Sequence, residues 1–211
     1  MPPRSPEKRS ELADEKRAQI LAAALDVFAE KGYHAAGIAD IAAKLGMGHG
    51  TFYRYFDNKL AIFGAVLDDI TGDITAVVRD EPAGADTLDA YRAQLDRITM
   101  RLFLVLANDP RRARVVFYEA WSVDPTMRAK VLSMFEVFGS YTEGYLTNGI
   151  AKGYLRESID VPVVARMLNA LIFEGLRACM LAENPVDVGV RYARAGLDFM
   201  LDGIARPEPR A

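Results

Sequence analysis

Residues 33–59 read YHAAGIADIAAKLGMGHGTFYRYFDNK, and the interpretation of the whole chain starts from them. Two short helical patterns, at about 38–45 and 49–56, are separated by the turn Gly46-Met47-Gly48. A three-residue turn that contains glycine lets two short helices cross steeply, as in a helix-turn-helix. Apolar residues at helical spacing are sufficient for a three-helix core: Phe28, Ile38, Ile41, Leu45, Phe52 and Phe56.

The opposite face of the second short helix is polar and aromatic. It carries the candidate DNA-binding residues His49, Gly50, Thr51, Tyr53, Arg54 and Tyr55, and Lys59 follows just past the helix. Arginine is the commonest reader of guanine edges, while hydroxyl and ammonium groups are common phosphate ligands. The alternative is that Tyr53 and Tyr55 are packing residues. Because Phe52 and Phe56 already fill the inward positions, we favour contact with double-stranded DNA.

The rest of the chain also has helical periodicity and no sustained alternation of apolar and polar residues, which predicts an all-α fold of about nine helices. We expect residues 1–57 to form an N-terminal arm and DNA-binding domain, and residues 58–211 to form a larger helical domain. The other helices are expected at about 12–31, 58–80, 87–107, 110–121, 125–152, 161–183 and 186–204.

Composition excludes several classes of protein. One cysteine and two histidines leave no intrachain disulfide and no thiolate zinc site, so we expect no metal. No phosphate-binding glycine loop and no Ser/His/Asp arrangement is present, so we expect neither an enzyme nor a cofactor. Without a leader-like or membrane-spanning apolar run, we expect a cytoplasmic protein. The net charge is −3, and residues 1–64 carry nine basic against eight acidic residues, so DNA binding must rest on a local patch.

A family resemblance extends over about residues 16–64. The string GMGHGTFYRYFDNKLAIF (46–63) resembles the helix-turn-helix signature of the TetR-type repressors, roughly G-V-S-K-G-x-L-Y-x-Y-F-x-x-K-x-x-L. The preceding EKGYHAAGIADIAAKLG (30–46) is similar to the same family. The departures are Gly37 where the family often has Thr or Ser, Ala39 where it often has Arg, Gly48 where it has Ser or Thr, and His49 where Lys, Arg or Pro is common.

The resemblance implies a two-fold dimer on a palindromic operator, with each recognition helix in a major groove and half-sites roughly 34 Å apart. It implies that the outward residues named above touch DNA and that Lys59 binds phosphate. It also implies a homodimer formed through helices 161–183 and 186–204. A basic N-terminal arm could add phosphate contacts, or it could be a solvated tail; its residues are Arg4, Lys8, Arg9, Lys16 and Arg17.

A small-molecule effector is expected in the larger domain. The candidate ligand-binding residues are Phe103, Phe117, Trp121, Phe138 and Tyr141, because aromatic walls with a few polar tips suit an apolar or aromatic ligand. The alternative for each is ordinary core packing. These observations favour a ligand-responsive DNA-binding transcriptional regulator, a repressor released from its operator by a small apolar or aromatic molecule. The alternative is a helical ligand-binding protein with weakened DNA binding.

Overall fold

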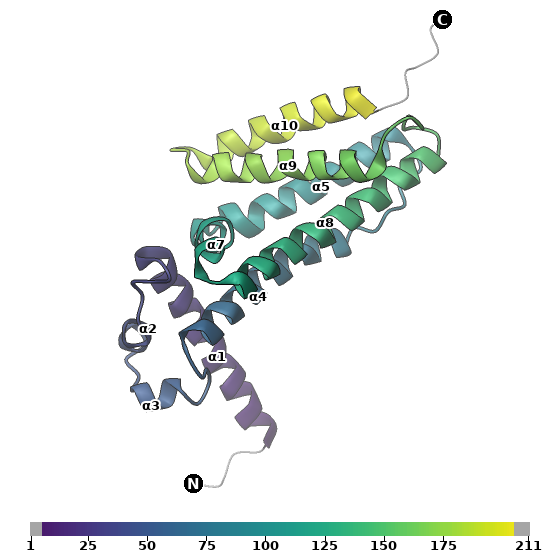
Figure 1. Ribbon diagram of the computed structural model, residues 1–211. Helices are drawn as coiled ribbons and strands as arrows, with labels where there is room; N and C mark the ends of the chain where they lie inside the picture. Colours follow the sequence, from purple (N-terminus) through teal and green to yellow (C-terminus); the bar gives the residue numbers. More distant parts are fainter. Residues whose placement is uncertain (1–5, 205–211) are drawn as a thin grey trace, which may run out of the picture. The chain divides into compact units, whose positions relative to one another are not determined.

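The computed structural model describes residues 6–204, with side chains from residue 12 onward except those of His49 and Ala107. Over this range the regular elements are all helical, which confirms the all-α prediction (Figure 1). The contacts divide the chain into two compact units. Unit 1 is the N-terminal part up to Ile70 together with Arg114–Lys130, and unit 2 is Thr71–Ala113 together with Val131 onward. The predicted domain boundary after residue 57 stays a prediction.

Unit 1 contains a three-helix head. It consists of α1 (Pro6–Lys31), α2 (Ile38–Lys44) and α3 (His49–Phe52), followed by the start of α4 (Lys59–Arg79). The buried side chains include Ile20, Phe28, Ile41, Phe52, Phe56 and Phe63. Of the predicted inward residues, Ile38 and Leu45 are half-buried. Gly32 and Gly46 follow α1 and α2 with φ of 77° and 59°, values that glycine adopts without strain and that commonly terminate helices.

The second short helix is shorter than predicted. α3 ends at Phe52, whereas the sequence pattern predicts a helix to residue 56. Beyond Phe52 the backbone continues in a tighter turn, in which the N–H of Tyr55 donates to the carbonyl of Phe52 at 2.9 Å. Such three-residue hydrogen bonds are typical of the last turn of a helix. Tyr53 and Arg54 therefore lie on a turn, and Phe56 still reaches the core.

The helix predicted at 110–121 is interrupted by a π-helical turn. The segment consists of α6 (Pro110–Arg114), the π-helix η1 (Val115–Glu119) and α7 (Ala120–Val123). The Glu119 carboxylate accepts a hydrogen bond from the N–H of Tyr33 at 3.0 Å. The ring Nε2 of His34 lies 3.0 Å from the carbonyl of Ser122, within hydrogen-bond distance. The turn between α1 and α2 is thus held by a segment about 85 residues later in the chain.

Unit 2 is a bundle of long helices. It contains α5 (Leu88–Ala107), most of α8 (Pro125–Ala151), α9 (Val161–Met180) and α10 (Pro185–Ile204). Figure 1 shows α9 and α10 side by side, with α5 packed against both. Asp160 caps α9, as its side chain accepts the N–H of Val163 at 3.3 Å. Over residues 6–204 no helix is both long and apolar enough to span a bilayer.

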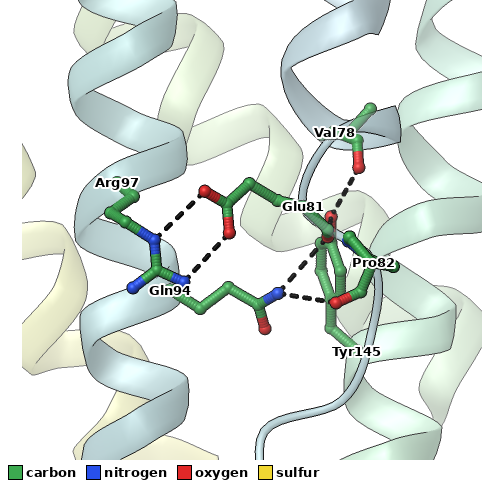
Figure 2. A network of polar contacts seen from close by, with 6 residues as sticks. All are labelled: Val78, Glu81, Pro82, Gln94, Arg97 and Tyr145. Atoms are coloured by element: carbon green, nitrogen blue, oxygen red, sulfur yellow. Dashed lines mark hydrogen bonds and ion pairs between the residues drawn. The ribbon is translucent and has the colours of Figure 1, made fainter.

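A polar network closes one end of unit 2 (Figure 2). The hydroxyl of Tyr145 lies 2.7 Å from the carbonyl of Glu81 and 3.1 Å from that of Val78. The Gln94 side chain donates to the carbonyl of Pro82 at 2.9 Å. The Arg97 guanidinium donates to both carboxylate oxygens of Glu81 at 3.1 and 2.9 Å and lowers the pKa of that carboxyl. The network fixes the chain where α4 ends.

A pair of matched substitutions tests the contribution of this network. Tyr145 and Tyr91 are 3% and 1% exposed, burial raises the pKa of both hydroxyls, and within the described residues the Tyr91 hydroxyl has no protein partner. We expect Tyr145→Phe to lower the free energy of unfolding by about 1–2 kcal/mol, because a buried hydrogen bond is lost. Tyr91→Phe should cost less, because it removes no protein hydrogen bond. Urea denaturation followed by circular dichroism measures both, and equal costs would contradict the assigned role of Tyr145.

Candidate functional site

The predicted DNA-binding residues lie on the outside of the head. Gly50, Thr51 and Arg54 are exposed, and Tyr53 is 52% exposed although its ring edge contacts Phe52. Tyr55 is half-buried. The side chain of His49 lies outside the described part of the structure. The outward direction that the sequence predicts for this face is therefore observed for Thr51, Tyr53 and Arg54.

Arg54 differs from the two ion-paired lysines of the head. Lys31 is paired with Asp40 at 2.8 Å, and Lys44 is paired with Asp26 at 2.8 Å. The Arg54 guanidinium is exposed and contacts no partner among the described residues. Its charge is consequently free to meet an anion or a base edge, while the paired lysines are partly neutralised.

Lys59 is held by the protein itself. Its ammonium group donates to the carbonyls of Tyr33, Ala36 and His34 at 2.7, 2.9 and 3.3 Å, and it lies 4.5 Å from the centre of the Tyr33 ring. A lysine ammonium has three donors, and all three have acceptors here. The predicted phosphate contact stays a prediction. In this structure Lys59 ties the segment between α1 and α2 to the start of α4.

Asp40 compensates in part for the glycine that precedes α2. Its carboxylate accepts the N–H of Gly37 at 2.9 Å, which is one half of a capping box. The other half needs a side-chain oxygen at residue 37, which glycine lacks. The same carboxylate accepts the Lys31 ammonium, and this ion pair, with the Gly37 N–H, lowers the pKa of Asp40. The spacing of Gly37 and Asp40 is visible in the sequence, but the prediction did not include Asp40.

Unit 2 contains two adjoining apolar cavities. The larger, of about 210 Å³, lies between α5, α9 and α10, and the smaller, of about 200 Å³, lies near the start of α6 and the turn between α9 and α10. Leu176 and Cys179 line both. The larger cavity is lined mainly by apolar side chains and glycines, among them Leu95, Phe103, Leu168, Ile172, Gly189, Ala193, Gly196 and Met200.

Only one of the five predicted ligand-binding residues lines these two cavities. Phe103 does so, whereas Phe117 and Trp121 belong to unit 1. Phe138 is 1% exposed, and its ring centre lies 5.6 Å from that of Phe173. Tyr141 is half-buried. Most of the other lining residues of the larger cavity lie on α9 and α10, the two helices that the sequence analysis assigned to dimerisation, and the rest lie on α5. The assignment of the five residues to a ligand site stays a prediction.

The two helices expected to dimerise do expose apolar side chains. Phe199 of α10 is 73% exposed and Met167 of α9 is 61% exposed. Other exposed apolar residues on these helices are Val163, Leu171, Val186, Val190 and Tyr192. Exposed apolar side chains that gather on neighbouring helices commonly mark a protein interface.

Comparison with known proteins agrees with the helix-turn-helix. Residues 20–66 match the model of the bacterial regulatory proteins of the tetR family. The fatty acid metabolism regulator protein of Bacillus subtilis is 27% identical over 189 residues, covering 90% of this chain and 95% of the relative. The transcriptional activator FasR of Mycolicibacterium smegmatis is 31% identical over 157 residues, covering 70% of each.

A solved structure extends the similarity to both units. The crystal structure of the transcriptional regulator FadR from Bacillus subtilis in complex with stearoyl-CoA matches with a TM-score of 0.74 and 28% identity, covering 89% of this chain and 98% of that one. The helix-turn-helix, its outward face, the family model and the relatives all agree on a DNA-binding regulator of transcription. The chain belongs to the TetR family of bacterial regulatory proteins.

Proposed function

We propose that this regulator is a homodimeric repressor that binds a palindromic operator without ligand and releases it when a long-chain acyl-CoA binds. The observation that carries the proposal is the exposed Arg54 on a helix-turn-helix head, which has no partner among the described residues, in a chain whose second unit holds apolar cavities. A head of this kind reads DNA, and an apolar cavity receives a ligand.

Three exposed side chains supply the DNA contacts in this proposal. Arg54 reads a guanine edge in the major groove, because no described residue pairs with its guanidinium, which can form two parallel hydrogen bonds. Tyr53 offers its hydroxyl to phosphate, and Thr51 offers a hydroxyl or a methyl group to a base edge. Lys59 is a positioning residue here, because its ammonium already holds the segment beside α2.

Dimerisation through α9 and α10 supports a palindromic operator. A two-fold dimer presents two identical heads, so its operator has two inverted half-sites about one helical turn apart. The exposed apolar side chains of α9 and α10, with Met167 and Phe199 foremost, are suited to a four-helix interface between two copies.

The effector class follows from the relatives together with the cavities. A relative that matches nearly the whole chain is named for fatty acid metabolism, and the FadR structure contains stearoyl-CoA. Apolar cavities in unit 2 suit the acyl part of such a ligand. The ligand favours a conformer in which the two heads are spaced wrongly for the operator, so binding shifts the population away from DNA.

The rival function is a helical ligand-binding protein with weakened DNA binding. Gly37, Ala39 and Gly48 favour it, because each replaces a residue type that often contacts DNA in the family. Selection of bound sequences from a random DNA pool separates the two functions. The proposal expects an enriched inverted repeat, and a pool that remains random after several rounds would support the rival.

Two substitutions separate base reading from positioning. Arg54→Ala should cost about 1–3 kcal/mol on the selected operator and relax base preference at one position, because a bidentate contact is lost. Lys59→Met should weaken binding to all sequences alike and leave the salt dependence unchanged, because its ammonium is bound to carbonyls and releases few counterions.

Fluorescence anisotropy across a salt series measures the DNA affinity of both variants and its dependence on salt. Lys44→Ala is the control. Because Lys44 is paired with Asp26, this substitution should leave base preference intact. If Lys59→Met lowers the salt slope by about one, Lys59 binds phosphate after all. If Arg54→Ala weakens every sequence equally, Arg54 does not read a base.

Acyl-CoA release is tested on the same operator. We expect saturating stearoyl-CoA to weaken operator affinity by roughly 5–150-fold, the usual range of allosteric coupling, while CoA alone has no effect. A promoter reporter then gives the sign of regulation. If transcription rises when the regulator is deleted, the result supports repression. If transcription falls, the regulator is an activator, as FasR is named, and the proposed repression is contradicted.

A further inference from the structure

We propose that Arg17 of α1 binds a phosphate of the operator, at the edge of the major groove that receives the recognition segment, residues 49–56. The inference rests on the proposed operator binding and adds to it a contact from outside the helix-turn-helix. The observation that carries it is the Arg17 guanidinium, whose central carbon lies 5.2 Å from the centre of the Phe56 ring. Figure 1 shows the chain after α3 passing beside α1.

The side chain of Arg17 is directed by the core of the head. Ile20 and Ala24 follow it three and seven residues later on α1, and both are 0% exposed. Residues at this spacing lie on one side of a helix, so Arg17 continues the buried stripe toward the start of α1. The side chain itself is exposed, which means that its stem follows apolar surface while its charge remains in water.

The contact with Phe56 leaves the hydrogen-bond donors of Arg17 available. An aromatic ring attracts a cation, but it does not accept the five guanidinium N–H groups as a carboxylate would. Among the described residues no carboxylate forms an ion pair with Arg17, although Asp14 lies one turn earlier on α1. A planar guanidinium donates two parallel hydrogen bonds to a phosphate, so Arg17 has the chemistry for this anion.

Other cations of the head are already occupied. Lys31 and Lys44 are paired with carboxylates, and Lys59 is held by backbone carbonyls. Arg17 and Arg54 have no such partner within the described part of the chain. Since Arg54 is proposed to read a base, Arg17 supplies the electrostatic contact that the head otherwise lacks.

The position of Arg17 favours a phosphate over a base. In the proposed complex Thr51 and Arg54 lie in the major groove, whose walls are two sugar-phosphate backbones about 12 Å apart. Phe56 comes two residues after Arg54 and is 6% exposed, so its ring belongs to the core and not to the groove. A cation beside this ring lies where the recognition segment leaves the groove, and there the nearest anion is a phosphate.

The ring contact also distinguishes Arg17 from a flexible basic arm. The side chains of Arg4, Lys8 and Arg9 lie outside the described part of the structure. Arg17 is held against Phe56, which anchors the recognition segment as well. A side chain that is already ordered loses less conformational freedom when it binds, so one ring prepares both the reading face and its phosphate contact.

Two substitutions at Arg17 separate phosphate binding from packing. Arg17→Met keeps an apolar stem on the Phe56 ring and removes the charge, whereas Arg17→Lys keeps the charge. On the selected operator we expect Arg17→Met to reduce the slope of log affinity against log salt concentration by about 0.9 for each head on the DNA, because one phosphate per head is no longer neutralised. Arg17→Lys should retain most of the slope, and both variants should keep the wild-type base preference.

Lys16→Met is the matched control. It removes the neighbouring charge of the same helix, but the Lys16 ammonium lies 3.1 Å from the side-chain oxygen of Gln19 and is a donor to it. This variant should keep the wild-type salt slope. If it reduces the slope as much as Arg17→Met does, the effect is a general loss of charge, and the inference is overturned. Circular dichroism melting of each variant confirms that the head is folded.

A second measurement locates the phosphate. Operators that carry one methylphosphonate at a time lack a single backbone charge. The wild type should lose affinity at one phosphate in each half-site that Arg17→Met no longer senses, while both proteins respond alike to every other replacement. If the two proteins respond alike at every position, Arg17 has no phosphate partner and the inference fails.

The outcomes distinguish this contact from the proposed function. If acyl-CoA releases a selected operator but Arg17→Met keeps the wild-type slope, the function stands and the inference is overturned. The same follows if Arg17→Met lowers affinity and thermal midpoint at an unchanged slope, because Arg17 then only packs on Phe56. If no operator is selected, the slopes are measured on a random-sequence duplex, since phosphate contacts do not depend on sequence. A reduced slope there supports the Arg17 contact although the proposed function has failed, and absence of binding to any duplex overturns both.

Discussion

The outward face of the head depends on two phenylalanines. A helix of four residues such as α3 is far too short to be stable alone, since forming a first helical turn costs more than it returns. Phe52 and Phe56 are 0% and 6% exposed and anchor this segment from below. Tyr53 and Arg54 lie between those two anchors in the sequence, so their direction is fixed by the burial of their neighbours.

The turn that precedes α2 is held in place by polar contacts, whereas α3 is held by buried phenylalanines. The carbonyls of the segment Tyr33–Ala36 have no helical hydrogen-bond partners. The Lys59 ammonium, at the start of α4, donates hydrogen bonds to three of them. The Glu119 carboxylate takes the N–H of Tyr33 from the other side. A buried or half-buried backbone group needs such a partner, because leaving it unpaired is costly. The turn that leads into α2 thus depends on charged side chains, while α2 itself is anchored by the buried Ile41 and Ala42.

The sequence predicted the helix-turn-helix well because its signals are local. Glycine stops and apolar residues three and four apart lie within one short stretch, and the outward direction of Tyr53 and Arg54 follows from them. The role of Lys59 could not be predicted in this way, since its acceptors are backbone carbonyls about 25 residues earlier. The end of α3 was missed because a tighter last turn has almost the same periodicity as an α-helix.

The apolar cavities of unit 2 were harder to predict, for a physical reason. On α9 and α10, apolar residues lie in the core, in the cavity wall and on the exposed surface. The helical periodicity of the sequence is the same for all three, so it cannot tell them apart. Aromatic content does not distinguish cavity wall from core either, since Phe138 is buried and packs against Phe173. Phe103 lines the larger cavity and is conspicuous in the sequence as an aromatic residue, whereas Gly189, which makes room for its ring, gives no signal of its own.

Unit 1 consists of two segments that are far apart in the sequence, and this affects how the protein folds during its synthesis. Unit 1 includes Arg114–Lys130 besides the head, and Glu119 in that segment holds the turn before α2. A ribosome releases the N-terminal residues long before residue 119 has been synthesised, so the nascent head lacks this support while most of α5 is being translated. A fragment of the first 57 residues, produced on its own to bind DNA, would lack the Glu119 contact permanently. The DNA-reading part is therefore continuous in space but discontinuous along the gene.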